Sequence, residues 1–426
     1  MNNIKEIKNE LLGDSYFEID HSSGLKIFVY PKENYSSAYA VFGTKYGSVD
    51  TAFRTEGEEK FTTVPEGIAH FLEHKLFESE ELDAFARYAK TGASANAYTS
   101  FDKTCYLFSC SGNFEESLEI LLDFVTNPYF TEKTVEKEQG IIGQEIKMTN
   151  DEPGWESLFS LLRAMYHNHP VKIDIAGTVE SISHITADLL YSCYRTFYNF
   201  SNMALAVAGN VTVEQVLGVA DKMLKAQPPK KIERKFEPEP PTVVQDTIVR
   251  NLPVSMPIFA IGYKEDVKTP CRTLKETLES EMLLDIIAGK TSSLYEELLN
   301  DGLINTTFET EYFEGYGYSA HIFTGESNDC EKVRERINRE LLKIIEEGVD
   351  RETFDRIKKK HYGSVIMHFD DVGSLANSLV GDYFNGDGLF DQLSVLESIT
   401  AEDIDNRLRT AINIENSAMS IIASAD

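Results

Sequence analysis

Two histidines and a glutamate stand close together in the segment VPEGIAHFLEHKLFES. His70 and His74 are four residues apart, and Glu73 lies three residues after His70. On an α-helix this spacing places the three side chains on one face. Two imidazoles in that arrangement can bind one metal ion, while the carboxylate stays available to take a proton from water. The spacing therefore predicts a metal site that can support hydrolysis.

The segment around these residues has the pattern of an amphipathic helix, which we expect over residues 64–79. An apolar stripe, centred nearly opposite the histidines, is formed by Ile68, Phe71, Leu72 and Leu76. One face can therefore pack in a core while the other builds a site. Pro65 suits the first turn, because the amide proton that proline lacks would have no helical partner there. The alternative is a solvated helix face with two unconnected histidines.

A zinc site needs a third protein ligand and an open position for water. A second predicted helix, over residues 131–149, is the best source. Its Glu138 and Glu145 are seven residues apart, so both point from the same face. Gly140 and Gly143 weaken this helix and leave room for another element to approach closely. Without the histidine motif, this segment would more simply be a charged surface helix.

The combination of His-x-x-Glu-His and, about seventy residues later, E-x6-E resembles the pitrilysin family of inverzincin zinc metallopeptidases. That family includes insulin-degrading enzyme and the mitochondrial processing peptidase. The resemblance extends through GASANAYTSFDKTCY and EKEQGIIGQEIKM and into GKTSSLYEELLNDGL. It implies that His70, His74 and Glu145 bind one Zn²⁺ per chain and that Glu73 is the general base on a zinc-bound water. Glu138 would support the ligands without binding the metal.

The resemblance also implies a substrate and a way to bind it. Asn96 and Ala97 fall on a predicted edge strand, residues 93–99, which in the family pairs with an extended peptide through main-chain hydrogen bonds. The implied activity is that of a zinc-dependent endopeptidase acting on peptides or small unfolded polypeptides. The competing interpretation of a different zinc hydrolase, such as an amidase for small molecules, fits this edge strand less well.

The second half of the chain departs from the family pattern. Its corresponding helix, ESEMLLDIIAG, contains no histidine, so we expect one metal site per chain. Active members typically carry an Arg and a Tyr near L-R-E-x-x-G-L-x-Y. Here Leu299 and Asn300 stand where the Arg would fall, and Asn305 stands where the Tyr would fall. Candidate replacements within the chain are Tyr312, Tyr316 and Tyr318.

A partner chain is another source of the missing groups. The resemblance implies a homodimer, or a heterodimer with a catalytically silent sister subunit. The main alternative to the peptidase is a non-catalytic structural or binding subunit of such a heterodimer. Family members with that role usually lack the zinc ligands, whereas this chain has all the expected positions.

A proline-rich, charged segment at residues 226–245 reads as a linker. It would separate an N-terminal catalytic domain, residues 1–225, from a homologous non-catalytic domain, residues 246–426. The two halves resemble each other: residues 185–208 align with residues 399–422 without a gap, at a constant offset of 214 (399 − 185). This offset, near half the chain length, favours a duplication.

Patterns for strands and helices do not alternate one for one. Strands are expected at residues 26–31, 37–44, 202–209 and 257–264, and a strand pair within residues 95–110. Further helices are expected at residues 114–126 and 279–289. The fold class is therefore predicted to be α+β, with two homologous domains that each have a largely antiparallel sheet covered by helices.

Composition bounds the remaining choices. The 426 residues include 41 basic and 70 acidic side chains, a formal charge of -29, which disfavours binding to nucleic acid or a membrane surface. No apolar run approaches the roughly 20 residues needed to span a bilayer, and the N-terminus lacks a secretory signal. Five scattered cysteines form no C-x-x-C pair. A cytoplasmic location fits best.

Overall fold

The computed structural model describes residues 2–80, 82–267 and 271–425. The chain forms two compact units, each assembled from three segments. Unit 1 comprises Met1–Ile146, Asp174–Phe236 and Ile366–Asp391. Unit 2 comprises Lys147–Ile173, Glu237–Val365 and Gln392–Asp426. The domain boundaries drawn from the sequence (1–225, 226–245 and 246–426) stay a prediction.

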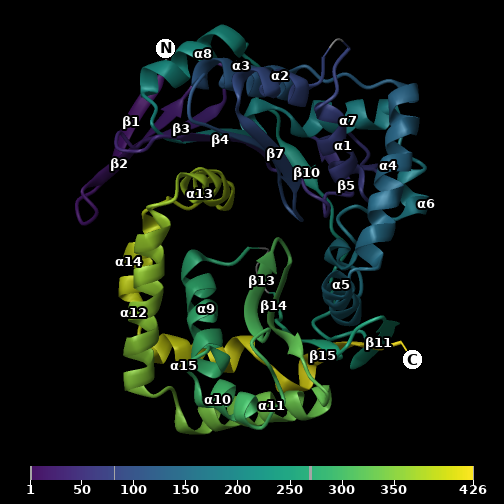
Figure 1. Ribbon diagram of the computed structural model, residues 1–426, viewed down its shortest axis with the longest axis vertical. Coiled ribbons are helices and arrows are strands. Elements are labelled where there is room, and N and C mark those ends of the chain that lie inside the picture. The colour runs from purple at the N-terminus through teal and green to yellow at the C-terminus, as the bar shows by residue number, and fades with distance from the viewer. Residues whose placement is uncertain (1, 81, 268–270, 426) are drawn as a thin grey trace. The chain divides into compact units, whose positions relative to one another are not determined.

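A mostly antiparallel sheet forms the centre of unit 1 (Figure 1). In spatial order its strands are β1 (Asn3–Asn9), β2 (Asp14–Asp20), β3 (Lys26–Pro31), β9 (Met203–Gly209), β4 (Ala38–Thr44), β8 (Thr104–Cys110) and β7 (Ser94–Thr99). Within the described part of this sheet only β3 and β9 pair in parallel, and β7 lies at the edge. A small sheet has the order β10 (Ile232–Arg234), β5 (Ala52–Thr55) and β6 (Thr62–Thr63).

Helices cover both faces of the main sheet of unit 1. On one face lie α1 (Ile68–Leu76), α2 (Ala84–Thr91), α3 (Phe114–Thr126), α7 (Ala187–Phe197) and α8 (Val213–Met223), with α6 (Val179–Ile182) beside them. The other face is covered by α13 (Val372–Asn385), which contacts β4 and β9 (Figure 1). The long helix α4 (Glu132–Asn150) packs beside α1 and continues into unit 2.

Unit 2 repeats this plan with fewer strands. Its sheet has the order β11 (Thr247–Leu252), β15 (Ser417–Ser424), β12 (Ile258–Lys264), β14 (Tyr318–Glu326) and β13 (Glu309–Gly315). Its helices are α5 (Pro153–Met165), α9 (Leu274–Ala288), α10 (Ser293–Asn300), α11 (Cys330–Glu347), α12 (Arg351–His368), α14 (Asp391–Ser398) and α15 (Ala401–Ala411), of which α12 and α14 reach into unit 1 at one end. Short 3₁₀ turns are η1 (Pro170–Lys172), η2 (Phe200–Asn202) and η3 (Ile414–Asn416).

The predicted duplication is confirmed by the repeated topology. The order β3-β9-β4-β8-β7 recurs as β11-β15-β12-β14-β13. In each of these five-strand series the first two strands are the parallel pair. The succession α7, η2, β9 recurs as α15, η3, β15 at the predicted offset of 214 (401 − 187). Both units are therefore α+β, as expected.

The two repeats exchange one helix each. Helix α5 is encoded in the first half but packs on β12 and β15 of unit 2. Helix α13 is encoded in the second half but packs on the equivalent strands β4 and β9 of unit 1. Throughout residues 2–80, 82–267 and 271–425, every helix is too short or too polar to span a lipid bilayer.

Helix α1 is shorter than the predicted residues 64–79, and Pro65 lies before it instead of in its first turn. The helix begins after Gly67, which has a φ of 85°. A β-carbon at Gly67 would lie 2.2 Å from the carbonyl oxygen of Ala176, so this close approach requires glycine. The start of α1 is thus fixed by a segment far along the chain.

Candidate metal centre

Helix α1 presents its polar residues as the sequence predicts. Its apolar stripe, Ile68, Phe71, Leu72 and Leu76, is buried in the core of unit 1. The histidine side chains on the other side keep partial exposure, 12% for His70 and 26% for His74. Glu73 is buried at 8% exposure. The helix therefore holds two accessible imidazoles beside a carboxylate that is largely withdrawn from solvent.

Glu145 on α4 faces both histidines. Its Oε1 lies 3.5 Å from Nε2 of His70, and its Oε2 lies 3.6 Å from Nε2 of His74. One ligand atom from each of the three residues lies within 4.8 Å of the other two. The structure thus brings together the three residues that the sequence resemblance proposes as ligands.

The spacing of these donor atoms fits a zinc ion. Two imidazole nitrogens and a carboxylate oxygen are a known zinc donor set, with bonds of about 2.0–2.2 Å. Donors at that distance from one ion, at a tetrahedral angle, lie about 3.4 Å apart. The two nitrogen–oxygen distances of 3.5 and 3.6 Å are close to this value. Zinc could therefore be held with little rearrangement.

Glu138, two turns before Glu145, orients one of the histidines. Its Oε1 lies 3.0 Å from Nδ1 of His74. An ionised carboxylate can only accept, so Nδ1–H donates and the lone pair of Nε2 is directed toward Glu145. Burial acts to lower the pKa of His74, but this hydrogen bond and the nearby carboxylates outweigh it and raise that pKa above its ordinary value.

The pKa values of the two neighbouring carboxyl groups, Glu145 and Glu138, are lowered in turn. The hydrogen bond with His70 lowers the pKa of Glu145, against the smaller effect of burial. Burial acts to raise the pKa of Glu138, but its contact with His74 more than offsets this and leaves the pKa lowered. The site therefore attracts positive charge. A cation that binds there competes with protons for the same side chains.

Glu73, the carboxylate predicted to act as the general base, is held by a residue of β7. Thr99 at the end of β7 donates from Oγ1 to Oε2 of Glu73 at 2.6 Å. Among the described residues, no hydrogen bond to Oε1 of Glu73 is present. Sequence reasoning missed Thr99, because a threonine at the end of a strand is common and carries no signal of its own.

The residues proposed to bind a peptide lie on the edge strand β7. Asn96 is exposed, and Ala97 is half-buried against the core. The backbone N–H of Ala97 donates to Oδ1 of Asn96 at 2.9 Å. In the described part of the chain, β7 pairs with β8 on one side only. Its outer side is thus available for main-chain pairing.

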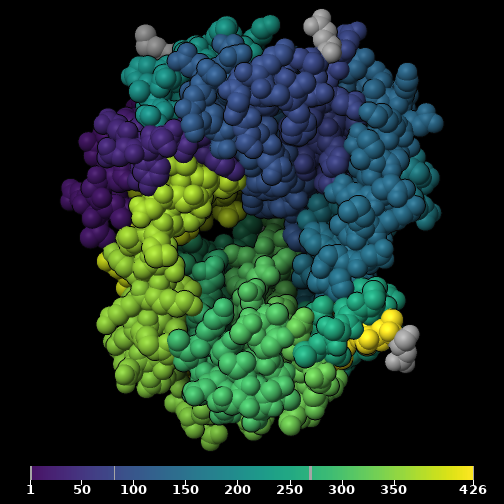
Figure 2. All heavy atoms as spheres, in the orientation of Figure 1, coloured from purple at the N-terminus to yellow at the C-terminus, as the bar shows by residue number. Residues whose placement is uncertain are grey.

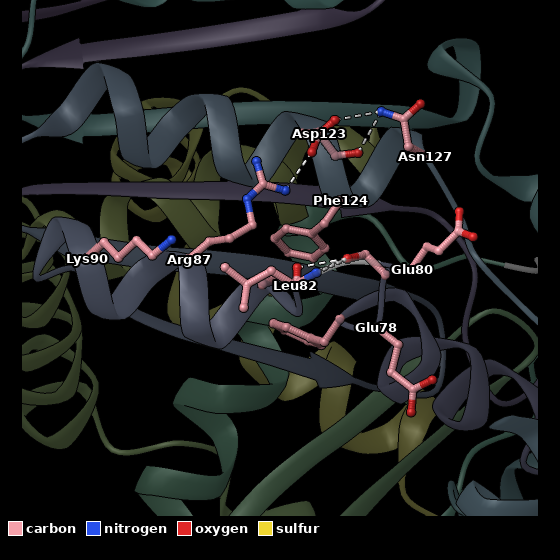
Figure 3. Close-up of a pocket in the computed structure, with 11 residues that line it drawn as sticks. Glu78, Glu80, Leu82, Arg87, Lys90, Asp123, Phe124 and Asn127 are labelled. Carbon is pink, nitrogen blue, oxygen red and sulfur yellow. Dashed lines mark hydrogen bonds and ion pairs between the residues drawn. The ribbon is translucent and has the colours of Figure 1, made fainter.

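A pocket of about 530 Å³ opens elsewhere on unit 1, between the end of α1, α2 and α3 (Figure 3). The residues that line it include Phe77 and Phe124, and Arg87 and Asp123, which also line it, form an ion pair at 2.5 Å. None of the three candidate ligands lines it. Helix α4 lies at the molecular surface, and several of its residues are exposed (Figure 2).

The described residues of unit 2 contain no group of side chains that could hold a metal ion. The positions that depart from the family pattern have other surroundings. Leu299 is 40% exposed near the end of α10, next to Asn300. Asn305 donates from Nδ2 to Oε2 of Glu326 at 2.6 Å. Of the three candidate tyrosines, Tyr312 bonds to Glu265 and Arg407, Tyr318 is buried, and Tyr316 is 43% exposed.

Comparison with known proteins identifies the family. Residues 62–179 match the family described as Insulinase (Peptidase family M16), and residues 184–360 match the Peptidase M16 inactive domain. An uncharacterized zinc protease of Bacillus subtilis (strain 168), YmfH, is 42% identical over 96% of this chain and 96% of its own. The chain belongs to peptidase family M16. The predicted pitrilysin-like resemblance is confirmed.

Other M16 relatives agree with the fold. The crystal structure of a putative M16-like peptidase from Alicyclobacillus acidocaldarius covers 100% of this chain and 99% of its own, with 36% identity and a TM-score of 0.92. The mitochondrial-processing peptidase subunit beta of Caenorhabditis elegans is 30% identical over 45% of this chain and 41% of its own. The match of residues 184–360 to an M16 inactive domain includes helix α9, which lacks histidine.

Proposed function

We propose that this M16 chain is a zinc-dependent endopeptidase that cleaves peptides or small unfolded polypeptides in extended conformation. The observation that carries the proposal is the convergence of His70, His74 and Glu145, whose ligand atoms lie within 4.8 Å of one another. Glu73 stands on the same helix as both histidines. This combination supplies a metal site and a separate proton acceptor, which are the two parts that metal-assisted hydrolysis needs.

The residues of the site have distinct tasks. Nε2 of His70, Nε2 of His74 and a carboxylate oxygen of Glu145 would hold one zinc ion. Zinc, when bound, polarises the scissile carbonyl and makes a water molecule more acidic. Oε1 of Glu73 takes the proton of the attacking water and later delivers it to the leaving amine. Glu138 keeps the His74 ring in the tautomer that presents Nε2.

The edge strand supplies the means to hold an extended chain. Asn96 and Ala97 lie within β7, whose outer side can add one further strand. Main-chain hydrogen bonds there would bind peptides with little regard to sequence. The same geometry offers little to a small amide, which favours a peptidase over a small-molecule amidase.

The second half suggests that the site is completed by another chain. Leu299, Asn300 and Asn305 occupy the region where active relatives carry an Arg and a Tyr. We therefore propose a homodimer, or a heterodimer with a catalytically silent sister subunit, working in the cytoplasm. The name of one relative, a subunit of mitochondrial-processing peptidase, is consistent with such an assembly.

The proposal is tested by metal content and peptide cleavage together. The purified protein should contain about one zinc per chain and cleave members of a fluorogenic peptide library. A chelator should remove the activity, and stoichiometric zinc should restore it. Glu73→Gln is the matched control: it keeps the shape of the side chain and the zinc, but it should lower kcat by about 10²–10⁴-fold, the usual contribution of a proton-transfer residue.

The alternative function, a non-catalytic structural or binding subunit, predicts a different outcome. Such a protein would bind peptides with equal affinity in the wild-type and Glu73→Gln forms and would cleave none. Cleavage should therefore be assayed with the chain alone and with proteins that co-purify with it. Zinc-independent cleavage, or full activity of Glu73→Gln, would contradict the proposed mechanism.

A further inference from the structure

A single hydroxyl group connects the edge strand to the proposed base. Thr99 is the last residue of β7, and its Oγ1 lies 2.6 Å from Oε2 of Glu73. Because an ionised carboxylate only accepts, the hydroxyl proton must point at Glu73. The contact is partly buried, where a charge-assisted hydrogen bond is stronger than in water. Thr99 can therefore determine how the Glu73 carboxylate is turned.

Thr99 is itself held firmly by its neighbours. It pairs with Thr104 across the β7–β8 turn, and Thr104 donates to the carbonyl of Tyr46 at 2.9 Å. The loop after β4 also binds this turn through hydrogen bonds from Ser48 to Ser100 (3.0 Å) and from Val49 to Phe101 (3.1 Å). The strand end is thus fixed from both sides.

The approach of the two loops is unusually close. A β-carbon at Gly47 would lie 2.3 Å from the backbone of Phe101, so a side chain there cannot be accommodated. Asp50 accepts from the Gly47 N–H at 2.9 Å and from Nε of Arg234 at 2.6 Å. Thr99 therefore projects from a rigid turn, which is the kind of support that keeps a reactive group in one orientation.

We propose that Thr99 is a positioning residue, which holds Oε2 of Glu73 and thereby keeps Oε1 directed at the reacting water. The proposal rests on the proposed peptidase function and extends it to a residue outside the metal-binding motif. Because β7 is also the strand that would pair with the peptide, one rigid strand would position both the substrate and the base. A misplacement of about 1 Å can cost on the order of 100-fold in rate, so one hydroxyl can matter.

The test compares Thr99→Val with Thr99→Ser in the zinc-loaded full chain. Valine keeps the shape of threonine but removes the donor, whereas serine keeps the donor. We expect Thr99→Val to lower kcat about 10- to 100-fold with KM and zinc content unchanged, and Thr99→Ser to retain most of the wild-type kcat. Thr91→Val is the matched control, because it deletes a buried hydroxyl that donates to the Tyr88 carbonyl at 3.0 Å, in α2. Its kcat should stay at the wild-type value.

A second measurement does not depend on activity. In crystals of the metal-free protein, Thr99→Val should show the Glu73 carboxylate turned or in several orientations, and Thr99→Ser should show the wild-type orientation. An unchanged Glu73 in metal-free Thr99→Val overturns the inference even if no peptide is ever cleaved. If the wild type cleaves peptides, Glu73→Gln does not, and Thr99→Val matches the wild type, the inference fails and the proposed function stands.

Discussion

Helices α1 and α9 occupy equivalent places in the two repeats, and the same pattern of burial runs along both. In α1, His70 and His74 are partly exposed and the three residues after each of them are buried. In α9, Glu281 and Asp285 stand four residues apart, and again three buried residues follow each. The repeats thus share one scaffold and differ in which polar side chains it presents.

The helix that faces these residues differs as well: it carries an acidic side chain in unit 1 and basic side chains in unit 2. In unit 1, α4 sets the carboxylate of Glu145 against the two histidines. In unit 2, the equivalent helix α12 sets Lys360 and His361 against Asp285, each at 2.7 Å. Unit 2 therefore neutralises its own carboxylate with side chains. In unit 1 two imidazoles and a carboxylate face one another instead, a donor set that suits the proposed zinc ion, so the exchange of residue types between the two helices separates an ion pair from a proposed metal site.

The strongest test of this comparison removes one imidazole from each repeat. His74→Ala should lower zinc affinity more than about 100-fold, beyond the 10–100-fold loss that supporting partners of a ligand produce. His361→Ala should leave one zinc per chain, because its ring pairs with Asp285 and not with the metal centre. Metal analysis after dialysis measures both. Equal zinc loss in the two variants would contradict the assignment of the site to unit 1.

A smaller effect is expected when the support of a ligand is weakened. Glu138→Gln keeps the size of the side chain but no longer favours a donating Nδ1–H on His74. Zinc affinity should fall about 10–100-fold while the stoichiometry at saturation remains one. Competition with a chelating dye measures the change. Wild-type affinity in this variant would show that Glu138 has no part in orienting the histidine.

The ion pair of Asp285 in unit 2 should make the free energy of unfolding depend on pH. Burial acts to raise the pKa of Asp285, but hydrogen bonds from His361 and Lys360 outweigh it and hold this pKa below the ordinary 3.8. A depressed carboxyl pKa stabilises the fold above pH 3.8, and that contribution is lost as the pH falls through the lower folded value.

Metal-free Asp285→Asn should therefore be less stable than the wild type at pH 7. The difference in free energy of unfolding, measured with urea, should shrink below pH 4. A difference that stays constant from pH 7 to pH 3 would mean that the Asp285 ion pair does not couple to folding.

The smallest effect concerns the glycines of α4. A β-carbon at Gly140 or Gly143 would meet nothing within 4 Å, so the close approach expected from the sequence is not found in the described structure. Gly140→Ala should therefore raise the free energy of unfolding by about 0.5–1 kcal/mol. Gly67→Ala is the contrasting control, since it should destabilise the start of α1. Destabilisation by Gly140→Ala would reveal a backbone requirement in the helix that carries the proposed ligand Glu145.

Much of the fold follows from local patterns. The strand expected at residues 26–31 and the helix expected at 114–126 coincide with β3 and α3, and β12 begins one residue later than predicted. These segments carry clear apolar periods bounded by polar turns. The exchange of α5 and α13 could not be predicted, because an apolar face shows that a helix packs but not on which sheet.

The candidate site, like the fold, could be predicted from local patterns only in part. The spacing of His70, Glu73 and His74 is enough to place them on one helix face, because an α-helix repeats every 3.6 residues. Bringing Glu145 to that face depends on tertiary packing: the sequence pointed to the helix at residues 131–149, and only the family resemblance singled out Glu145 as a ligand. The burial of Glu73 and its bond to Thr99 depend on a turn fixed by distant loops, which no local pattern records.

The exchanged helices also set the order in which the protein can be completed during synthesis. Helix α13 covers β4 and β9 with its buried Leu375, Leu379 and Val380, yet it is completed about 149 residues (385 − 236) after the rest of the sheet of unit 1. At 5–20 residues per second the ribosome needs roughly 8–30 s for that stretch. Throughout this interval one face of the first sheet stays uncovered on the nascent chain. A gene cut in the linker would make that exposure permanent unless both fragments were produced together.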